Sequence, residues 1–243
     1  MKTIDINSDV GEGVGNEALL MPLLSSCNIA CGGHAGDEDI MREVLAFAKA
    51  YNVKIGAHPS YPDKDNFGRS IMEISDKVLK ESIIDQISKL KHLAEENGQH
   101  LHHVKPHGAL YNQAAIDKGV AMLIIEAIRS VDENLAIYVP YKSVIAKLAK
   151  PYLTTIIEGF ADRSYHQDYT LVSRTHPEGV LNNAQDVVAH VLPMIMKDNL
   201  ISLEGHILLF KVDTLCVHGD TENAIDIVRA LRSQLHSEGI QII

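Results

Sequence analysis

Short runs of apolar and β-branched residues alternate along the chain with segments in which apolar residues recur every three or four positions. The first pattern is typical of buried strands and the second of amphipathic helices. Strands are predicted near residues 3–9, 27–33, 53–58, 100–107, 135–140, 154–160 and 208–217, with a short final strand in the closing IQII. Helices are predicted near residues 37–51, 75–96, 112–131, 142–150, 182–197 and 222–238. The pattern therefore predicts a regular succession of strands and helices.

This alternation favours a parallel sheet whose strands are connected by helical crossovers. In the longest predicted helix, 75–96, the stripe expected to face the sheet consists of Val78, Ile83, Ile87, Leu90 and Leu93. No linker, low-complexity segment or charge block interrupts the succession, and 243 residues suit one domain of α/β-barrel size. We therefore predict a single catalytic domain over residues 1–243.

The predicted strands end in polar side chains that are followed closely by glycine or proline. These side chains are Asp9, His34, His58, Lys105, His107, His218 and Asp220. A doubly wound sheet concentrates function at one switch point, whereas a barrel brings the carboxyl ends of all its strands to one mouth. Because polar ends occur from the first strand to the last, we predict a TIM-like (β/α) barrel of seven or eight strands, incomplete or distorted in its ring.

The composition restricts the partners and the compartment. The formal net charge is -10 and no Lys/Arg-rich stretch offsets it, which argues against a nucleic-acid-binding surface. The longest apolar runs are too short to span a bilayer, and the first residues lack the apolar core of a signal peptide. Three cysteines form an odd and sparse set, which suits a reducing cytoplasm. We expect a cytoplasmic protein that binds neither nucleic acid nor membrane.

The segment NSDVGEG places three polar groups at the end of the first strand. Asn7 and Asp9 are two residues apart and share a face, and Glu12 follows in a flexible loop. Carboxylates at a barrel mouth can bind a metal, act as a general base or hold an ammonium group, whereas a structural Asp9 would only cap the turn. Because this run of polar and glycine residues does not build a core, we favour function. The chain has no phosphate loop ending in Gly-Lys-Ser/Thr, so an ATP site needs another architecture.

Three histidines and a lysine follow later strands. His34 lies between glycines in CGGHAGD, and the proline after His58 holds that residue extended. Each histidine alone would be read as structural, and together they become site candidates. Lys105 and His107 in VKPHGALYN point the same way from their strand. A lysine inside a barrel is costly unless it is paired, so an ion pair with Asp9 and stabilisation of an oxyanion or phosphate are the alternatives.

Charged residues in two polar loops are candidates for binding an anionic ligand, and the polar strand ends are candidates for binding a metal. Arg69 lies in NFGRS, and Asp162 and Arg163 lie in FADRSY. The planar guanidinium of arginine suits bidentate recognition of carboxylate or phosphate. A metal site is chemically reasonable at four of the polar strand ends, Asp9, His34, His58 and His107. No ligand spacing in the sequence signals such a site, which requires the fold to bring these groups together.

Six motifs, NSDVGEG, NIACGGHAGD, GAHPSYPDKDNFGRS, VKPHGALYNQA, FADRSY and VHGD, occur in the order found in the LamB/YcsF family, which the chain closely resembles from residue 1 to about residue 239. One departure is Gly33, where many family members carry a bulkier residue; we expect this glycine to affect loop flexibility more than chemistry. The resemblance implies a TIM-like barrel of the glycoside hydrolase/deacetylase type. It also implies the role of the A subunit in an ATP-dependent 5-oxoprolinase, with 5-oxoproline and ATP (with Mg²⁺) as substrates and two other subunits, B and C, as partners.

Ring opening of 5-oxo-L-proline to L-glutamate requires activation, because a five-membered lactam is a stable amide. Phosphorylation of the amide oxygen by ATP would make the ring carbon electrophilic, and the site must then hold phosphate, activate water and bind the substrate carboxylate. We hypothesise that Asp9 and His107 transfer the water proton while Lys105 holds the activated oxygen, with His58 as a further candidate base. Substrate contacts are expected from Asn7, Glu12, His34, Arg69, Asp162, Arg163 and, mainly by resemblance, His218.

Two other functions are kept open. The first is a metal-dependent deacetylase or amidase acting on a small polar or sugar substrate, which the Asp/His-rich mouth would suit. The second is a non-catalytic substrate-binding subunit whose partners perform the chemistry, which the absence of a phosphate loop would suit.

Overall fold

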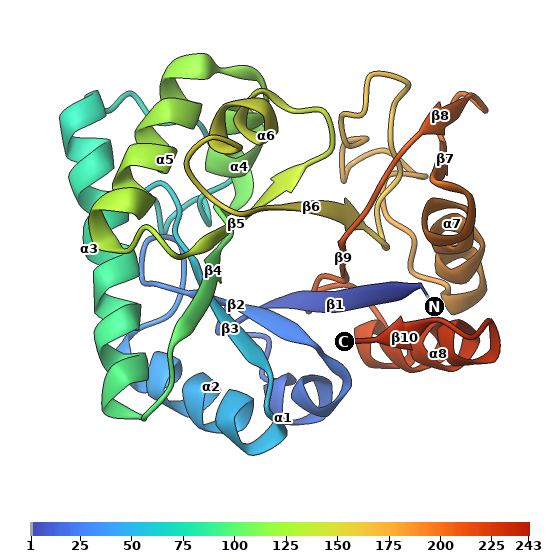
Figure 1. The fold of residues 1–243 in the computed structure, drawn as a ribbon, viewed down its shortest axis with the longest axis horizontal. Helices are drawn as coiled ribbons and strands as arrows, with labels where there is room; N and C mark the ends of the chain where they lie inside the picture. The colour runs from blue at the N-terminus through green and yellow to red at the C-terminus, as the bar shows by residue number, and fades with distance from the viewer. Residues whose placement is uncertain (1) are drawn as a thin grey trace.

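Seven parallel strands close into a barrel in the computed structural model, which describes residues 2–243. The barrel strands are β1 (Thr3–Val10), β2 (Ser26–Ala30), β3 (Lys54–His58), β4 (Leu101–Val104), β5 (Ala136–Pro140), β6 (Thr155–Phe160) and β9 (Thr214–Cys216). They pair in chain order, and β1 pairs with both β2 and β9, which closes the ring (Figure 1). The prediction of a TIM-like barrel with seven strands is therefore confirmed.

Helices surround the barrel on its outer side (Figure 1). They are α1 (Glu17–Leu20), the 3-10 helix η1 (Met21–Leu23), α2 (Glu38–Tyr51), α3 (Asp76–Glu96), α4 (Gly108–Ile116), α5 (Lys118–Val131), α6 (Val144–Ala149), α7 (Ala184–Lys197) and α8 (Ala224–Ser237). Within residues 2–243, none of these helices combines the length and the apolar character that a membrane span requires. The two-residue strand β10 (Gln241–Ile242) pairs in parallel with the start of β1.

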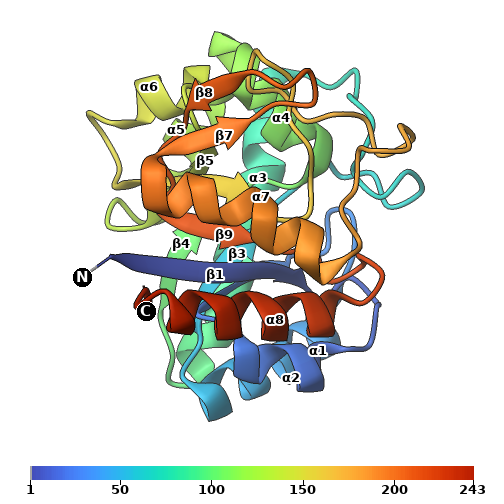
Figure 2. The same ribbon diagram turned by 90° about the vertical axis from the view of Figure 1, so that its right-hand side faces the viewer.

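The predicted continuous strand over 208–217 is wrong. Its first part is β8 (Ile207–Leu209), which pairs antiparallel with β7 (Asn199–Ile201) outside the barrel, next to α7 (Figure 2). The chain enters the barrel only at Asp213, whose backbone N–H donates to Ile157 O and whose carboxylate accepts from Ile157 N, both at 2.8 Å. The first part of this segment therefore belongs to the small β7–β8 sheet, and its last part belongs to the barrel.

Two helical predictions also need correction. The helix expected over 112–131 is divided at Asp117, whose extended backbone and side chain cap the start of α5 by accepting from Val120 N at 3.0 Å. In α3, Val78 is 51% exposed, whereas its neighbour Leu79 is 3% exposed and packs in the core. The apolar stripe therefore begins one residue later than expected.

The barrel interior below the mouth is filled by hydrogen-bonded polar side chains. Asn28 donates to Asn7 Oδ1 and Asp9 Oδ1, both at 2.8 Å, and Asn7 donates to Thr214 Oγ1 at 2.8 Å. The Nε2 of His103 lies 2.7 Å from Asn28 Oδ1, so it carries a hydrogen that it donates to this oxygen. Asn7, Asn28 and His103 are fully buried. Interiors of such barrels usually contain branched apolar residues, so these polar groups must be paired to be tolerated.

A glycine on β3 makes room for the histidine of this layer. The ring of His103 stacks on Tyr138 with centroids 3.8 Å apart. A Cβ added to Gly56 would lie 2.2 Å from His103 Nε2, closer than atoms can approach. The backbone of β3 therefore passes directly against the imidazole that supports Asn28.

We predict that Gly56→Ala lowers the free energy of unfolding by about 1–3 kcal/mol, because the methyl group must displace His103 from Tyr138 and Asn28. Denaturant unfolding of the purified variant measures this loss. Gly119→Ala is the matched control, since this glycine is exposed in the first turn of α5 and its Cβ would meet only the exposed Asp117 side chain. Equal stabilities of the two variants would contradict the close packing of β3 on His103.

Candidate functional site

The polar residues that follow the barrel strands gather at the carboxyl end of the ring. Asp9 lies near the end of β1, His58 is the last residue of β3, and His218 follows β9. Beyond β4, Lys105 and His107 continue the pairing with the β3 side, because their N–H groups donate to Ala57 O and Pro59 O at 2.9 and 2.8 Å. This extended course explains why the two side chains point the same way.

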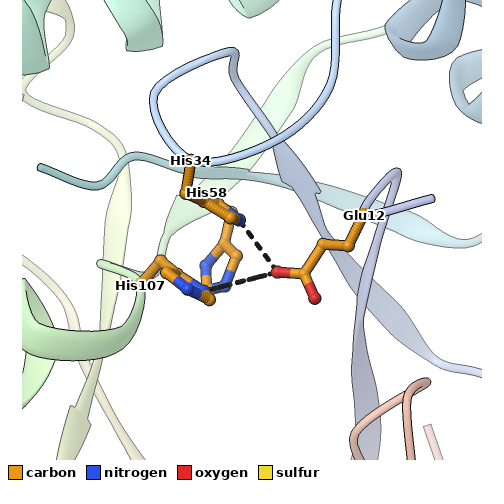
Figure 3. A group of neighbouring side chains, drawn as sticks. All are labelled: Glu12, His34, His58 and His107. Carbon is orange, nitrogen blue, oxygen red and sulfur yellow. Dashed lines mark hydrogen bonds and ion pairs between the residues drawn. The ribbon is translucent and has the colours of Figure 1, made fainter. Parts of the chain in front are cut away.

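Four of these residues form one cluster around a carboxylate oxygen, shown in Figure 3. Glu12 Oε1 lies 2.9 Å from His34 Nε2, 3.3 Å from His107 Nδ1 and 3.7 Å from His58 Nε2. The nitrogens of His107 and His58 that face this oxygen are 3.0 Å apart. The three imidazoles approach the same side of the Glu12 carboxylate, and all three are buried. We call Glu12, His34, His58 and His107 the histidine cluster.

Burial and charge set the protonation of the histidine cluster. Burial lowers the pKa of His34 to about 4 and lowers the pKa of His107, in spite of the Glu12 carboxylate beside both rings. Burial alone would also lower the pKa of His58, but the adjacent Asp9 carboxylate outweighs it and raises this pKa. Burial raises the pKa of Glu12, and its contacts with His107 and His34 outweigh that effect and hold the pKa well below its usual value.

The loop after β3 covers the histidine cluster. Phe67 packs edge-on against the rings of His34 and His107, with centroids 5.2 and 5.4 Å apart. Its backbone has a φ of 55°, and its carbonyl oxygen lies 2.9 Å from His107 Nε2. Gly68 follows with a φ of 62°, and a side chain there would press on the Cβ of His34 at 3.0 Å. The left-handed turn thus brings both an aromatic ring and a carbonyl onto the cluster.

Next to the histidine cluster, Lys105 is held between carboxylates inside the barrel. Its Nζ lies 2.9 Å from both Asp9 Oδ1 and Glu158 Oε1 and 3.2 Å from Cys216 Sγ. Burial would lower the pKa of Lys105, but these neighbours raise it well above its usual value. Burial would raise the pKa of Asp9, and the charges of His58 and Lys105 hold it well below its usual value. The ion pair between Lys105 and Asp9, one of the two alternatives for this lysine, is present.

Glu158 is a member of this network that the sequence analysis did not identify. It lies in β6 within the apolar run TIIEGF and is 1% exposed. A lone carboxylate inside an apolar strand is costly unless it is paired. The single glutamate in this apolar run could therefore have indicated a buried ion pair. Its partner Lys105 comes from β4, on the far side of β5, so the pairing depends on the curvature of the barrel.

Asp162 and His218 form a separate pair on the β6–β9 side of the mouth. The Asp162 carboxylate accepts from His218 N at 3.0 Å, from His218 Nδ1 at 2.9 Å and from Thr221 Oγ1 at 2.5 Å. Burial would raise the pKa of Asp162, but His218 and these hydrogen bonds lower it. The ring of His218 stacks on Phe160 with centroids 5.2 Å apart. Asp162 is therefore buried and positions His218 instead of reaching the mouth itself.

The arginines divide into two groups. Arg69 and Arg174 converge on Asp220 at 3.0 and 3.1 Å and remain partly exposed. Arg163 is buried, and its guanidinium donates to Gly179 O and Val172 O at 3.0 and 2.5 Å, which holds the long loop after β6. The structure thus directs Arg163 into the protein and leaves Arg69 at the surface.

Asn7 and Gly33 are also placed differently from the sequence-based expectation. Asn7, expected to contact substrate, lies below the mouth with no exposed surface and with its amide engaged by Thr214 and Asn28. A Cβ on Gly33, expected to affect flexibility, would lie 2.4 Å from both Gln86 Oε1 and Ser60 Oγ. Gly33 is therefore a close-packed position that holds the loop carrying His34 against α3.

We predict that Lys105→Met lowers the free energy of unfolding by about 3–5 kcal/mol at neutral pH, because Asp9 and Glu158 lose their buried counter-charge. Adding Glu158→Gln should restore part of this loss by removing one unpaired carboxylate. Denaturant unfolding of both variants measures the two effects.

The control for this prediction is Lys91→Met, which breaks the partly exposed pair with Asp132 and should cost less than about 1 kcal/mol. If Lys105→Met were no more destabilising than Lys91→Met, the buried network would not support the barrel.

Comparison with known proteins places this arrangement in a family. The model of the LamB/YcsF family matches residues 4–243. The A subunit of the 5-oxoprolinase of Histophilus somni (strain 129Pt) is 40% identical over 243 residues, covering 100% of this chain and 98% of that protein. The A subunit of the 5-oxoprolinase of Shouchella clausii (strain KSM-K16) is 42% identical over 248 residues, with the same coverage. The crystal structure of a lactam utilization protein from Thermus thermophilus superposes with a TM-score of 0.92 at 33% identity, covering 100% of this chain and 99% of that one. The chain belongs to the LamB/YcsF family.

Proposed function

We propose that this chain is the A subunit of a 5-oxoprolinase that hydrolyses 5-oxo-L-proline to L-glutamate, coupled to ATP hydrolysis. The observation that carries the proposal is the similarity over the full chain to the A subunits of two 5-oxoprolinases, at 40% and 42% identity. The concentration of buried carboxylates, imidazoles and one ammonium group at the barrel mouth supports a hydrolytic site in this chain. The designation of both relatives as one subunit of an enzyme supports a complex, for which we propose two other subunits, B and C.

We propose the following division of labour. ATP, with Mg²⁺, would transfer its terminal phosphoryl group to the lactam oxygen and leave as ADP; water would then add to the ring carbon, the ring C–N bond would break and phosphate would leave. Asp9, His58, Lys105 and His107 form the reacting side of the mouth, where Lys105 and its carboxylates maintain a fixed charge distribution. The exposed guanidinium groups of Arg69 and Arg174 suit the substrate carboxylate or the phosphate, in exchange for Asp220.

His218 is the imidazole best suited to exchange a proton with the substrate. Its Nδ1 is engaged by Asp162, which fixes the ring orientation as the carboxylate of a catalytic triad does. The ring nitrogens of His58 and His107, in contrast, face one another within the histidine cluster. Asp9 is a weak base, because its pKa is held well below the usual value by His58 and Lys105 against the effect of burial. We therefore assign His218 an acid–base role in addition to the substrate contact expected from the sequence.

We predict that a reconstituted complex of this chain with its two partner subunits releases glutamate and phosphate, and that omitting this chain abolishes glutamate release. Measuring the two products separately with each subunit left out in turn tests the proposal. Continued glutamate formation by the partners alone would show that this chain is the non-catalytic binding component. Activity of the isolated chain on N-acetylated sugars would instead favour the deacetylase alternative.

We predict that Asp162→Asn lowers kcat for glutamate release by about 10²–10⁴-fold, because the neutral amide no longer fixes His218 for proton transfer. KM should change much less, since Asp162 is buried and acts through His218. Glu204→Gln, which alters an exposed carboxylate 2.7 Å from His166 Nδ1, is the matched control and should leave kcat unchanged. A variant with normal kcat would exclude a role of the Asp162–His218 pair in proton transfer.

A further inference from the structure

Two imidazoles of the histidine cluster face one another through ring nitrogens that the backbone leaves without a partner. His58 Nδ1 lies 2.7 Å from Lys105 O, and His107 Nε2 lies 2.9 Å from Phe67 O. Carbonyl oxygens only accept hydrogen bonds, so each of these ring nitrogens carries a hydrogen. In the neutral rings, the other two nitrogens therefore carry lone pairs, and these nitrogens are 3.0 Å apart. Two facing lone pairs at this distance repel unless a cation lies between them.

The remaining members of the cluster present further ligand atoms to the same point. Glu12 Oε1 lies 3.3 and 3.7 Å from the two facing nitrogens and 2.9 Å from His34 Nε2. Ligands at zinc–nitrogen and zinc–oxygen distances around a tetrahedral ion are separated by about 3.3 Å. The four separations that the structure gives, 2.9, 3.0, 3.3 and 3.7 Å, bracket this value. A single proton could satisfy only one of these contacts at a time, whereas a metal ion between the His58 and His107 nitrogens would also lie within reach of Glu12.

We propose that Glu12, His34, His58 and His107 bind one divalent transition-metal ion of the zinc class. Three imidazoles and one carboxylate suit zinc and its first-row neighbours, whereas Mg²⁺ and Ca²⁺ prefer oxygen ligands. The carbonyls of Lys105 and Phe67 act as the outer hydrogen-bond partners that orient metal-binding histidines. The inference concerns this chain alone and holds whether or not its substrate is 5-oxoproline.

His34 is the adjustable ligand of this site. Its ring lies parallel to that of His107, with centroids 3.6 Å apart and planes 2° from parallel, so both rings cannot direct lone pairs at one ion without a rotation. Within residues 2–243, the buried Nδ1 of His34 has no hydrogen-bond partner, so no such bond opposes that rotation. His58, His107 and Glu12 are accordingly expected to dominate the affinity.

The neighbouring group Asp9, Cys216 and His218 has ligand atoms within 4.8 Å of one another, yet it does not suit a metal. The Lys105 ammonium already donates to both Asp9 Oδ1 and Cys216 Sγ. Burial also raises the pKa of Cys216, so its sulfur stays a thiol instead of the thiolate that binds metals. Of the four residues that the sequence suggested as ligands, Asp9 contacts only one of the three histidines, His58, through Oδ2 at 3.3 Å, whereas Glu12 lies with all three and takes its place.

The test is metal binding by the isolated chain. The protein is stripped with a chelator, dialysed and titrated with Zn²⁺ and with Co²⁺, whose visible absorption reports its coordination. We expect one ion per chain with the spectrum of a low-coordinate nitrogen–oxygen site. His58→Gln and His107→Gln should each weaken binding by at least about tenfold. His92→Gln, at a 71% exposed side chain on α3, is the matched control and should bind as the unaltered chain does.

Glu12→Gln provides a second test if a histidine variant fails to fold, because Glu12 lies in the loop after β1 and the substitution preserves the size of its side chain. This variant should fold, shown by an unchanged circular dichroism spectrum, and should weaken Co²⁺ binding and shift its absorption. The absence of stoichiometric binding by the unaltered chain, or equal binding by Glu12→Gln and His92→Gln, would overturn the proposal. Failure of oxoprolinase activity in the reconstituted complex would instead bear on the proposed function and leave the metal-binding result unaffected.

Discussion

The buried ammonium of Lys105 is the group on which the rest of the barrel mouth depends. It lies 2% exposed between carboxylates from β1 and β6 and next to the thiol of β9, so one side chain links four of the seven strands. Removing charged groups from water is expensive, and this arrangement is stable only because each charge has a partner. The polar groups at the mouth therefore lie above carboxylates that already have a buried partner.

Asp9 connects this ion pair to Asn28 and to the histidine cluster. Its Oδ1 is shared by Lys105 and Asn28, both within 2.9 Å, and its Oδ2 lies 3.3 Å from His58 Nε2. Asn28 is in turn fixed by His103, which stacks on Tyr138 over the close-packed Gly56. A rigid polar layer of this kind positions reactive groups without loss of conformational entropy during the reaction, which is what preorganisation requires.

The sequence was sufficient to predict the barrel because its evidence is repeated in every strand–helix unit. Polar residues at the ends of strands from β1 to β9 pointed to a closed ring, and the pairing of β1 with β9 confirms that ring. The division of 208–217 was not predictable, because an apolar run has the same composition whether it pairs with β7 outside the barrel or with β1 inside it. Likewise, the exposed Val78 and the buried Leu79 are adjacent apolar residues, and only packing of α3 distinguishes them.

The site was harder to predict because its contacts join residues that are distant in the chain. Glu12 reaches the histidine cluster through a loop in which Gly11 and Gly13 have positive φ angles of 73° and 83°, a conformation that the sequence permits without specifying. Asn7 shares a face with Asp9, as its spacing predicted, yet lies one layer deeper. The alternation of residues along a strand establishes whether a side chain points into the barrel. How far below the mouth that side chain lies depends on the stagger between neighbouring strands.

The two sides of the barrel mouth carry different charged groups and therefore suit different parts of a ligand. On the β1–β4 side, Glu12 and Asp9 face three imidazoles, which is an environment that attracts a cation. On the β6–β9 side, Asp162 is occupied by His218 and Thr221, and the partly exposed guanidinium groups of Arg69 and Arg174 share Asp220. An anionic substrate would therefore approach with its carboxylate toward the arginines and its reacting carbonyl toward the cation-binding side. This polarity exists before any substrate binds, because strands hold Asp9 and His58, and side-chain contacts hold Glu12 and the two arginines.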